Sequence, residues 1–386
     1  MKPAAKLLLK LLILVLPFVI ISIPILLSGE FLSGKLVSVL QQKYDFSILY
    51  GPIAESQYRF YKSESTRIVK PSVILMGDSR ALVIHSFFFN EDIIFYNTGY
   101  TVTNTAEMQY FLESQDTSNM DVIIFALNHF SFNINWSDVG YPNHQDYITP
   151  HPPDYIANIK SQIDYLQSSR KAGKSVLTKN IFDTGLLGLN AVINSNGMLN
   201  DGSYFYGEIH YKEDDGQDTQ GRMEDTLDRI ENANRRFQHG ERANPNAIHY
   251  LELFLQYCKD NDIYVICFAP PYAPIVNKAM KERGDAYAYQ YETLEIVPRI
   301  FENFGYEFYD YTDASFLGCT DDFYLDGFHG SDVVFLRMFI DMIEHGSRLG
   351  RYCALDDLQI FNTERFSNTR LFETWKQYNK LTLLRH

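Results

Sequence analysis

Short apolar runs and segments of helical periodicity alternate along most of this sequence. Five short segments rich in apolar and aromatic residues precede polar, loop-forming residues: 73–76, 93–96, 121–126, 262–269 and 306–310. The first of them, 73–76, is apolar without a break. Continuous apolar runs of this length are typical of strands that are buried on both faces of a parallel sheet. A helix is expected to begin near Thr103 or Asn104, both good N-caps, and a last helix to cover residues 333–345. The alternation predicts an α/β fold with a mostly parallel central sheet and helices on both faces.

Three parts of the chain lie outside a simple alternation: one interval within the predicted domain at residues 71–346, and the segments before and after that domain. The interval of about 131–260 is too long for one crossover and is expected to contain a helical insertion or cap. Its helical patterns cover residues 155–170, 223–237 and 246–260. Residues 30–70 are predicted to form a helical stem and loop before the domain. Residues 347–386 are predicted to pack on the domain as a C-terminal extension of one or two helices.

The N-terminus has the pattern of a membrane anchor. Lys2, Lys6 and Lys10 precede or interrupt an almost unbroken apolar run at residues 7–28. Its part from Leu11 to Ser28 approaches the ~20 residues that a helix needs to cross a bilayer, and lysines at the start favour a cytoplasmic N-terminus. A cleaved signal peptide is the competing interpretation, but no Ala-x-Ala-like site closes the run. The sequence therefore predicts a single-pass cell-membrane protein, anchored through residues 1–29, with its domain on the extracytoplasmic side.

Composition narrows the classes of function without selecting one. Hydrophobic residues make up 46% of the chain and charged residues 21%, which supports a sizeable core and argues against wholesale disorder. The net charge of −14 argues against binding to a phosphate backbone, since that requires clustered lysine and arginine. No nucleic-acid partner is therefore expected.

Neither the cysteines nor the acidic residues form a metal-binding pattern. The four cysteines match no metal-ligand spacing: Cys258, Cys267, Cys319 and Cys353. Cys319 and Cys353 lie in loop-like stretches, so a disulfide between them stays open if that part of the chain is outside the cytoplasm. The acidic stretch 213–218 lacks the ligand spacing of a calcium loop, and a solvated loop is favoured over a calcium site. No metal site is predicted.

Residues with catalytic potential follow the predicted strands. Ser79, Gly99, Asn128 and the pair Asp326/His329 all lie in loops after such strands. Because the carboxyl ends of parallel strands meet at one edge of the sheet, we expect these loops to lie close together. Each residue also has a purely structural alternative: a helix cap for Ser79 or Asp326, a surface histidine for His329, and a turn that requires glycine for Gly99.

This set matches the needs of acyl transfer. A serine hydroxyl such as that of Ser79 becomes a nucleophile when an imidazole accepts its proton, and the imidazole needs a carboxylate to orient it. The Asp-x-x-His spacing lets Asp326 reach Nδ1 of His329 from the same turn. The N–H groups of Ser79 and Gly99 and the amide of Asn128 are the predicted donors to the oxyanion.

Two neighbouring residues are further candidates for contact with a substrate. Arg80 follows the predicted nucleophile and would suit an anionic group, although pairing with a local carboxylate is the competing role. His129 follows Asn128 and would lie near the site. Its alternative is a loop histidine packed against the insertion.

On these residues the sequence resembles the SGNH (GDSL-type) hydrolases over most of residues 70–345. Gly77-Asp78-Ser79 is similar to the first block of that family, Gly99 to the second, Asn128 to the third and Asp326-x-x-His329 to the last. Two blocks depart from the usual pattern. The first continues with Arg80 where leucine is usual, and the third reads Ala-Leu-Asn-His where Gly-x-Asn-Asp is usual.

The resemblance implies a three-layer, flavodoxin-like α/β fold and a serine esterase or O-acyltransferase that needs no cofactor. The anchor makes the chain similar to membrane-bound SGNH-like proteins of bacterial cell-surface modification. These include partners of membrane-bound O-acyltransferases and the D-alanine-transfer protein of teichoic acid systems. The implied activity is transfer of an O-acyl group, acetyl by expectation, to or from an exported glycopolymer through an ester on Ser79. The implied partners are a membrane-bound acyl donor and the polymer.

Two other functions stay open from the sequence. One is an exported lipase or esterase that hydrolyses small acyl esters in water. The other is a non-catalytic subunit of a polymer-modification complex that keeps the same fold.

Overall fold

A computed structural model describes residues 26–44, 47–53, 58–136, 185–206 and 219–363, with isolated positions 10, 14–16, 163 and 167. Most of the predicted anchor lies outside the described residues, as do the helical pattern at 155–170, the acidic stretch at 213–218 and the end of the C-terminal extension. Among the residues that are described, no helix combines the length and the apolar character that crossing a bilayer requires.

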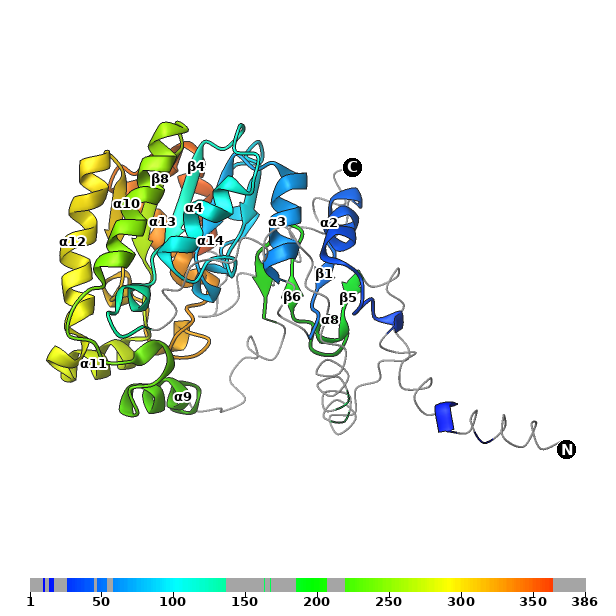
Figure 1. Ribbon diagram of the computed structural model, residues 1–386, viewed down its shortest axis with the longest axis horizontal. Helices are drawn as coiled ribbons and strands as arrows, with labels where there is room; N and C mark the ends of the chain where they lie inside the picture. Colours follow the sequence, from blue (N-terminus) through cyan, green and yellow to red (C-terminus); the bar gives the residue numbers. More distant parts are fainter. Residues whose placement is uncertain are drawn as a thin grey trace, which may run out of the picture.

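The larger sheet has five parallel strands in the order β3-β2-β4-β8-β9 (Figure 1). Their bounds are β2 (Val73–Met76), β3 (Phe95–Asn97), β4 (Val122–Ala126), β8 (Tyr264–Ala269) and β9 (Glu307–Asp310). The parallel sheet predicted from the apolar runs is thus confirmed. β3 begins two residues later than predicted, and Ile94 before it is 53% exposed. From β2 the chain adds β3 on one side and β4 on the other, so the direction of strand addition reverses between β2 and β4. In open α/β sheets ligands bind at such a switch point.

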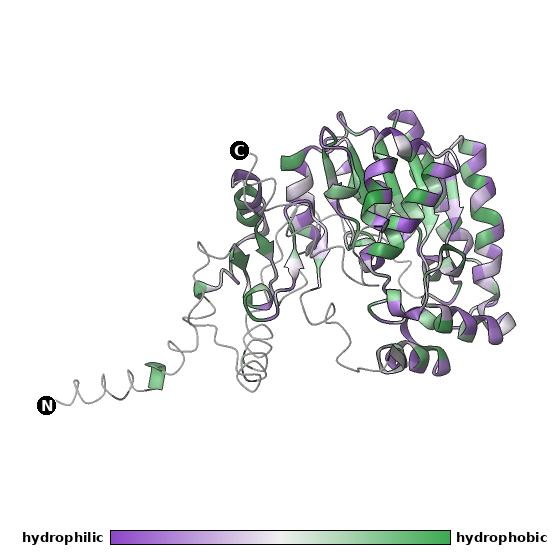
Figure 2. Cartoon of the chain, turned by 180° about the vertical axis from the view of Figure 1, so that it is seen from behind, coloured by the Kyte–Doolittle hydropathy of each residue, from purple (hydrophilic) through white to green (hydrophobic). Residues whose placement is uncertain are grey.

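Helices cover both faces of this sheet, so alternate strand residues enter two separate cores. On one face Ile74 and Met76 of β2 belong to a core shared with α4, α10 and α12; on the other Val73 and Leu75 belong to a core shared with α13. These helices are α4 (Thr105–Glu113), α10 (Pro245–Asp260), α12 (Ala288–Phe304) and α13 (Asp332–Glu344). Figure 2 shows apolar strands between helices with polar outer sides. Asn104 caps α4, at one of the two predicted positions.

α10 belongs to the layer that covers the sheet rather than to the predicted insertion at about 131–260. It packs against α4 and α12 and leads directly into β8. Two parallel neighbours such as β4 and β8 need a crossover that covers the sheet, and α10 supplies it. The added segment therefore ends before Pro245. Its described part contains residues 185–206, helix α9 (Thr219–Glu231) and the short helix η5 (Arg235–Phe237).

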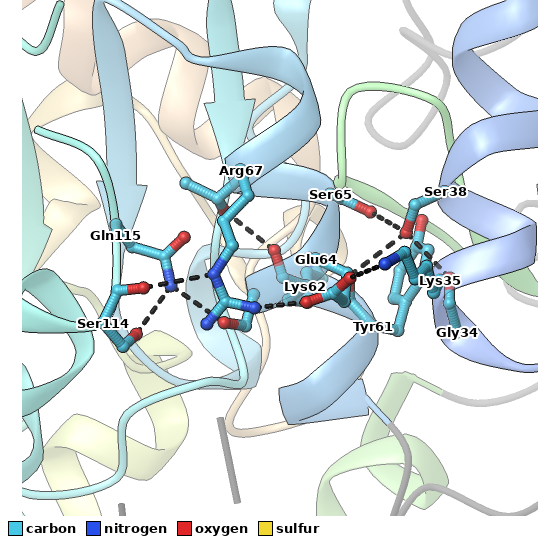
Figure 3. Close-up of polar contacts among 12 residues, drawn as sticks. Gly34, Lys35, Ser38, Tyr61, Lys62, Glu64, Ser65, Arg67, Ser114 and Gln115 are labelled. Carbon is cyan, nitrogen blue, oxygen red and sulfur yellow. Dashed lines mark hydrogen bonds and ion pairs between the residues drawn. The ribbon is translucent and has the colours of Figure 1, made fainter. Parts of the chain in front are cut away.

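The predicted stem joins part of this insertion in a second, smaller sheet with the order β5-β1-β6-β7. The stem supplies β1 (Leu49–Tyr50), and the insertion supplies β5 (Leu186–Leu187), β6 (Gly197–Met198) and β7 (Tyr204–Phe205). Helices α2 (Gly34–Lys43) and α3 (Tyr58–Val69) pack on each other beside it. Figure 3 shows their polar contacts, among them Ser38 Oγ at 2.7 Å from Ser65 Oγ. The stem is therefore part of the folded body.

The C-terminal extension is described as far as α14 (Leu355–Thr363), which lies against α13 and buries Leu358. Cys319 and Cys353 are both buried and free, so the disulfide left open by the sequence does not form.

Candidate active site

Ser79 lies in a tight turn at the carboxyl end of β2. The turn passes so close to β4 that a Cβ on Gly77 would lie 2.9 Å from Cβ of Ala126. Asp78 then caps the short helix η2 (Ser79–Ala81) by accepting a hydrogen bond from the N–H of Arg80 at 2.9 Å. The cap fixes the backbone on both sides of Ser79, which is 9% exposed.

The structure brings Ser79, His329 and Asp326 together, although 250 positions separate the serine from the histidine. Ser79 Oγ lies 2.9 Å from His329 Nε2, and His329 Nδ1 lies 2.9 Å from Asp326 Oδ2. Donation of Nδ1–H to the carboxylate assigns the ring proton to Nδ1 and leaves the Nε2 lone pair for the hydroxyl. This arrangement, called the triad below, has the order nucleophile, base and orienting carboxylate.

The carboxylate of Asp326 is fixed by its own loop. Its Oδ1 accepts hydrogen bonds from the N–H groups of Phe328 and His329, both at 2.7 Å. Burial alone would raise the pKa of Asp326, but the contact with His329 and these N–H groups lower it to about 2. Asp326 is therefore ionised at neutral pH and can stabilise an imidazolium on His329.

Asn128 lies beside the nucleophile turn because β2 and β4 are adjacent parallel strands. Met76 pairs with Phe125, so Ser79 and Asn128 each lie three residues beyond a paired position. Within the described chain, the N–H of Ser79 and the side-chain amide of Asn128 donate to no other group, and Asn128 Oδ1 is buried without a partner. Both predicted donors are thus available to an oxyanion.

Gly99 does not fit its predicted role as an oxyanion donor. Its N–H donates to Asn97 Oδ1 at 2.8 Å, inside the fold. The amide of Asn97 in turn donates to the carbonyls of Ala81 and Ile84, both at 2.9 Å, so this side chain ties β3 to the segment after the nucleophile. A Cβ on Gly99 would lie 2.8 Å from Asn97 Oδ1, which explains the glycine. Asn97 is a positioning residue that the sequence did not reveal.

Arg80 does not face the site and pairs with no carboxylate among the described residues, contrary to both sequence interpretations. Its side chain is buried, and Nη2 donates to the carbonyls of Pro270 and Pro271 at 2.6 and 2.5 Å. The guanidinium lies 4.2 Å from the ring centre of Tyr272 and 4.8 Å from that of Phe328. Arg80 therefore clamps the nucleophile turn to the end of β8 and to the loop of His329.

His129 is also buried beneath the site, so its predicted contact with substrate is not supported. Its Nε2 lies 2.7 Å from the hydroxyl of Tyr272. Burial, with a smaller contribution from the nearby charge of Arg80, lowers the pKa of His129 well below its usual value. This fully buried imidazole packs against Tyr272, whose ring also contacts Arg80.

All three triad residues line a cavity of about 630 Å³. The insertion and the stem form much of its wall, which includes Tyr58 of α3 and Tyr206 just after β7. Tyr206 donates a hydrogen bond to the carbonyl of Ser79 at 3.4 Å, and its ring centre lies 6.2 Å from that of His329. Burial raises the pKa of Tyr206 well above its usual value, so the hydroxyl stays protonated as a donor.

Three arginines of the insertion, Arg229, Arg235 and Arg236, also line this cavity. The sequence offered one signal, the adjacent pair Arg235-Arg236, but nothing in it placed that pair near Ser79. In the parts of the chain that the structure describes, no three histidine, cysteine, aspartate or glutamate residues are grouped as metal ligands.

Comparison with known proteins gives no family for the chain: no family model, no curated protein and no solved structure matches it. The case for a function therefore depends on the residues and geometry of this site.

Proposed function

We propose that the chain is a membrane-anchored serine acyltransferase or esterase of the SGNH type that acts on an exported glycopolymer. The observation that carries the proposal is the unbroken hydrogen-bonded series from Ser79 through His329 to Asp326, at 2.9 Å for each step, on the wall of a cavity. A serine in such a series is activated for attack on a carbonyl carbon.

In the proposed reaction Ser79 Oγ attacks the carbonyl of an acyl donor while its proton passes to Nε2 of His329. The tetrahedral intermediate collapses, the C–O bond to the donor alcohol breaks, and that alcohol takes the proton from His329. The acyl group is then an ester on Ser79. A hydroxyl of the acceptor gives its proton to His329 and attacks the ester. The bond from the acyl carbon to Ser79 Oγ then breaks, and Ser79 Oγ takes the proton back from His329. Asp326, ionised throughout, stabilises the imidazolium in both halves.

The N–H of Ser79 and the amide of Asn128 are the proposed donors to the oxyanion. Both are unengaged in the described chain, whereas the N–H of Gly99 is occupied by Asn97. A site with two such donors still supplies electrostatic stabilisation, since each is worth ~10²–10³ in kcat.

Attachment to a membrane is supported by the apolar run at residues 7–28 and by the exposed side chains at and beyond its end. Leu26 is 62% exposed and Leu27 60%, and Leu36 and Val39 are exposed on α2. The cavity would then lie near membrane-bound acyl carriers, which favours transfer over hydrolysis. A membrane-bound O-acyltransferase is the proposed donor, acetyl the proposed group and a surface glycopolymer the proposed acceptor.

The test is labelling of the full-length protein in detergent micelles with a fluorophosphonate, followed by peptide mass spectrometry. We expect an adduct on Ser79, no adduct in Ser79→Ala, and turnover of 4-nitrophenyl acetate that Ser79→Ala abolishes. A sugar acceptor should divert the acyl group from water if the protein is a transferase, and should have no effect if it is an esterase. Absence of both the adduct and the turnover would refute the proposal and favour a non-catalytic subunit.

A further inference from the structure

The cavity that contains the triad has a positively charged wall inside a strongly acidic protein. The net charge of the chain is −14, yet the charged residues that line the cavity besides the triad are Arg229, Arg235 and Arg236. Asp326 is the one carboxylate among the described lining residues, and it is engaged by His329. The described part of the cavity therefore does not neutralise its own arginines.

The acidic residues of α9 point away from this wall. Arg229 pairs with Asp225 one turn earlier on the helix, but the side chain of Asp225 is 72% exposed and that of Arg229 only 21%. Nε of Arg229 is buried without a hydrogen-bond partner in the described chain. The helix thus directs its carboxylates to solvent and a guanidinium toward the cavity, with a donor unused.

Arg236 is held rigidly next to the catalytic loops. Its guanidinium lies 5.5 Å from the ring centre of Phe130 and 5.2 Å from that of Phe328. Phe328 precedes His329, and Phe130 follows Asn128 by two residues, so Arg236 lies between the two loops that flank Ser79. No carboxylate of the described chain pairs with it. A guanidinium fixed on aromatic faces is preorganised to bind an anion bidentately.

Arg235 lines the cavity as an exposed residue and has an unfavourable backbone conformation. Its φ is +54°, and that of Ala233 two residues earlier is +48°. A side chain at positive φ costs of order 1 kcal/mol or more and occurs preferentially at functional sites. No ion pair within the described residues accounts for the placement of Arg235.

The remaining wall suits a neutral ring. Tyr100, Tyr204 and Trp136 line the cavity with Tyr58 and Tyr206. Amphipathic aromatic rings of this kind pack against the apolar faces of sugars and leave polar edges for hydrogen bonds. The indole N–H of Trp136 has no partner in the described chain, so one such donor is unused.

We propose that the cavity binds an anionic sugar, in which a phosphate or carboxylate group is held by Arg229, Arg235 and Arg236 beside the hydroxyl that is acylated. The aromatic side chains hold the sugar ring, and the arginines select the charge. This inference rests on the proposed function for the position of the acylated hydroxyl. Selection of the charge itself does not require any turnover.

Binding can therefore be tested in a protein that is unable to react. The full-length Ser79→Ala chain in a Trp375→Phe background leaves Trp136 as the one tryptophan of the two in the sequence. Its fluorescence in detergent micelles is followed during titration with glucose, glucose 6-phosphate and glucuronate. We expect at least one anionic sugar to bind about 10-fold or more tightly than glucose. The order of the two anions tells phosphate from carboxylate.

Charge selection should depend on the cavity arginines alone. The double variant Arg235→Gln/Arg236→Gln should bind the anionic sugar about as tightly as glucose. Arg283 pairs with Glu231 outside the cavity, so Arg283→Gln should retain the preference for the anionic sugar. Raising the salt concentration from about 0.05 to about 0.5 M should weaken the preference for the anionic sugar in the protein that retains all three cavity arginines. This measurement tests the inference if the double variant does not fold. Equal affinities for all three sugars, or a preference that survives both tests, would overturn the inference. Turnover of 4-nitrophenyl acetate without a charge preference would overturn this inference and leave the proposed function standing.

Discussion

The described residues include two groupings of serine, histidine and aspartate that differ in which residue stands in the middle. In the triad the histidine lies between the serine and the carboxylate. The second grouping consists of His85, Asp201 and Ser203, where β7 approaches the main sheet, and its middle member is the serine. Ser203 Oγ lies 2.7 Å from His85 Nδ1 and donates to Asp201 Oδ1.

Because the serine stands in the middle, the second grouping has no base that could accept the proton of the serine hydroxyl. The hydroxyl of Ser203 donates a hydrogen bond to Asp201, which also accepts from the N–H groups of Ser203 and Ser86 at 2.9 and 2.7 Å. The serine can then only accept from Nδ1–H of His85, so Nε2 of His85 is left buried without a partner. In the triad, by contrast, the unprotonated nitrogen of His329 faces the hydroxyl.

The two groupings also differ in access. None of the three residues in the buried grouping lines the cavity, and burial, offset only in part by Asp201, lowers the pKa of His85 to about 4. Its neighbours connect the two sheets: the carbonyl of Asp201 accepts from the N–H of Asn97 at 2.7 Å, and Lys62 donates to the carbonyls of Asn97 and Gly202. The same residue types thus form the triad on the cavity wall in one place and a buried joint, which connects the two sheets, in the other.

The largest difference is expected from the two histidines. His329→Ala removes the base and should lower kcat by ~10⁶-fold, with little change in the free energy of unfolding. His85→Ala should do the reverse, since it leaves catalytic contacts intact but costs about 1–3 kcal/mol through the lost hydrogen bond and the space left behind. Turnover of 4-nitrophenyl acetate and urea unfolding of each purified variant measure the two effects.

That comparison fails if His85→Ala lowers kcat as much as His329→Ala does at a temperature where both variants are folded. The buried grouping would then act on the reaction, and its role as a joint would need revision.

Much of the fold and the triad was within reach of the sequence. The strand before Ser79 has four consecutive buried apolar residues, because helices cover both faces, and such a run is visible without a structure. The spacing of Asp326 and His329 is equally local, since one turn joins them. Parallel strands put their carboxyl ends at one edge, which brings that turn to Ser79.

The rest depended on contacts that no local pattern encodes. Strands of two residues, such as β1 and β5, carry no periodicity, so the union of stem and insertion was not predicted. Gly99 follows a strand, where a donor was expected, but its N–H donates to Asn97, and only the folded arrangement decides which acceptor wins. The charged wall required the insertion to be placed in space.

The next largest difference is expected from the carboxylates of Asp326 and Asp201. Asp326→Asn retains the shape of the side chain but no longer orients Nδ1–H of His329, and should lower kcat by ~10⁴-fold. Asp201→Asn leaves at least one N–H donor less well paired and should cost about 1–3 kcal/mol of unfolding free energy, with kcat close to that of the unsubstituted protein. Steady-state kinetics and urea unfolding are the measurements. A kcat for Asp326→Asn near the original would show that the carboxylate does not serve the triad.

A third difference is expected between Asn128, a proposed donor to the oxyanion, and Asn97, which connects parts of the fold. Asn128→Ala removes a free donor and should lower kcat by ~10²–10³-fold with KM nearly unchanged. Asn97→Ala should act on stability, by about 1–3 kcal/mol, because it removes the bonds to Gly99, Ala81 and Ile84. If Asn128→Ala changes only KM, Asn128 binds the ground state and the transition state equally and is not a selective oxyanion donor.

A further difference should appear in the pH dependence of stability, to which His85 of the buried grouping contributes. The pKa of His85 is about 4 in the folded chain against about 6.5 when unfolded, so the unfolded state binds the extra proton between these values. The stability that this residue contributes is present above pH about 6.5 and is lost as the pH falls through about 4. Between pH 7 and 4.5 the loss amounts to about 2–3 kcal/mol.

His85→Asn keeps a donor for Ser203 without the titration and should reduce the loss by that amount, whereas His249→Asn at an exposed position of α10 should not. Urea unfolding at the two pH values decides the matter, and an acid-induced loss that is the same in all three proteins would show that His85 does not titrate as a buried, neutral joint between the sheets.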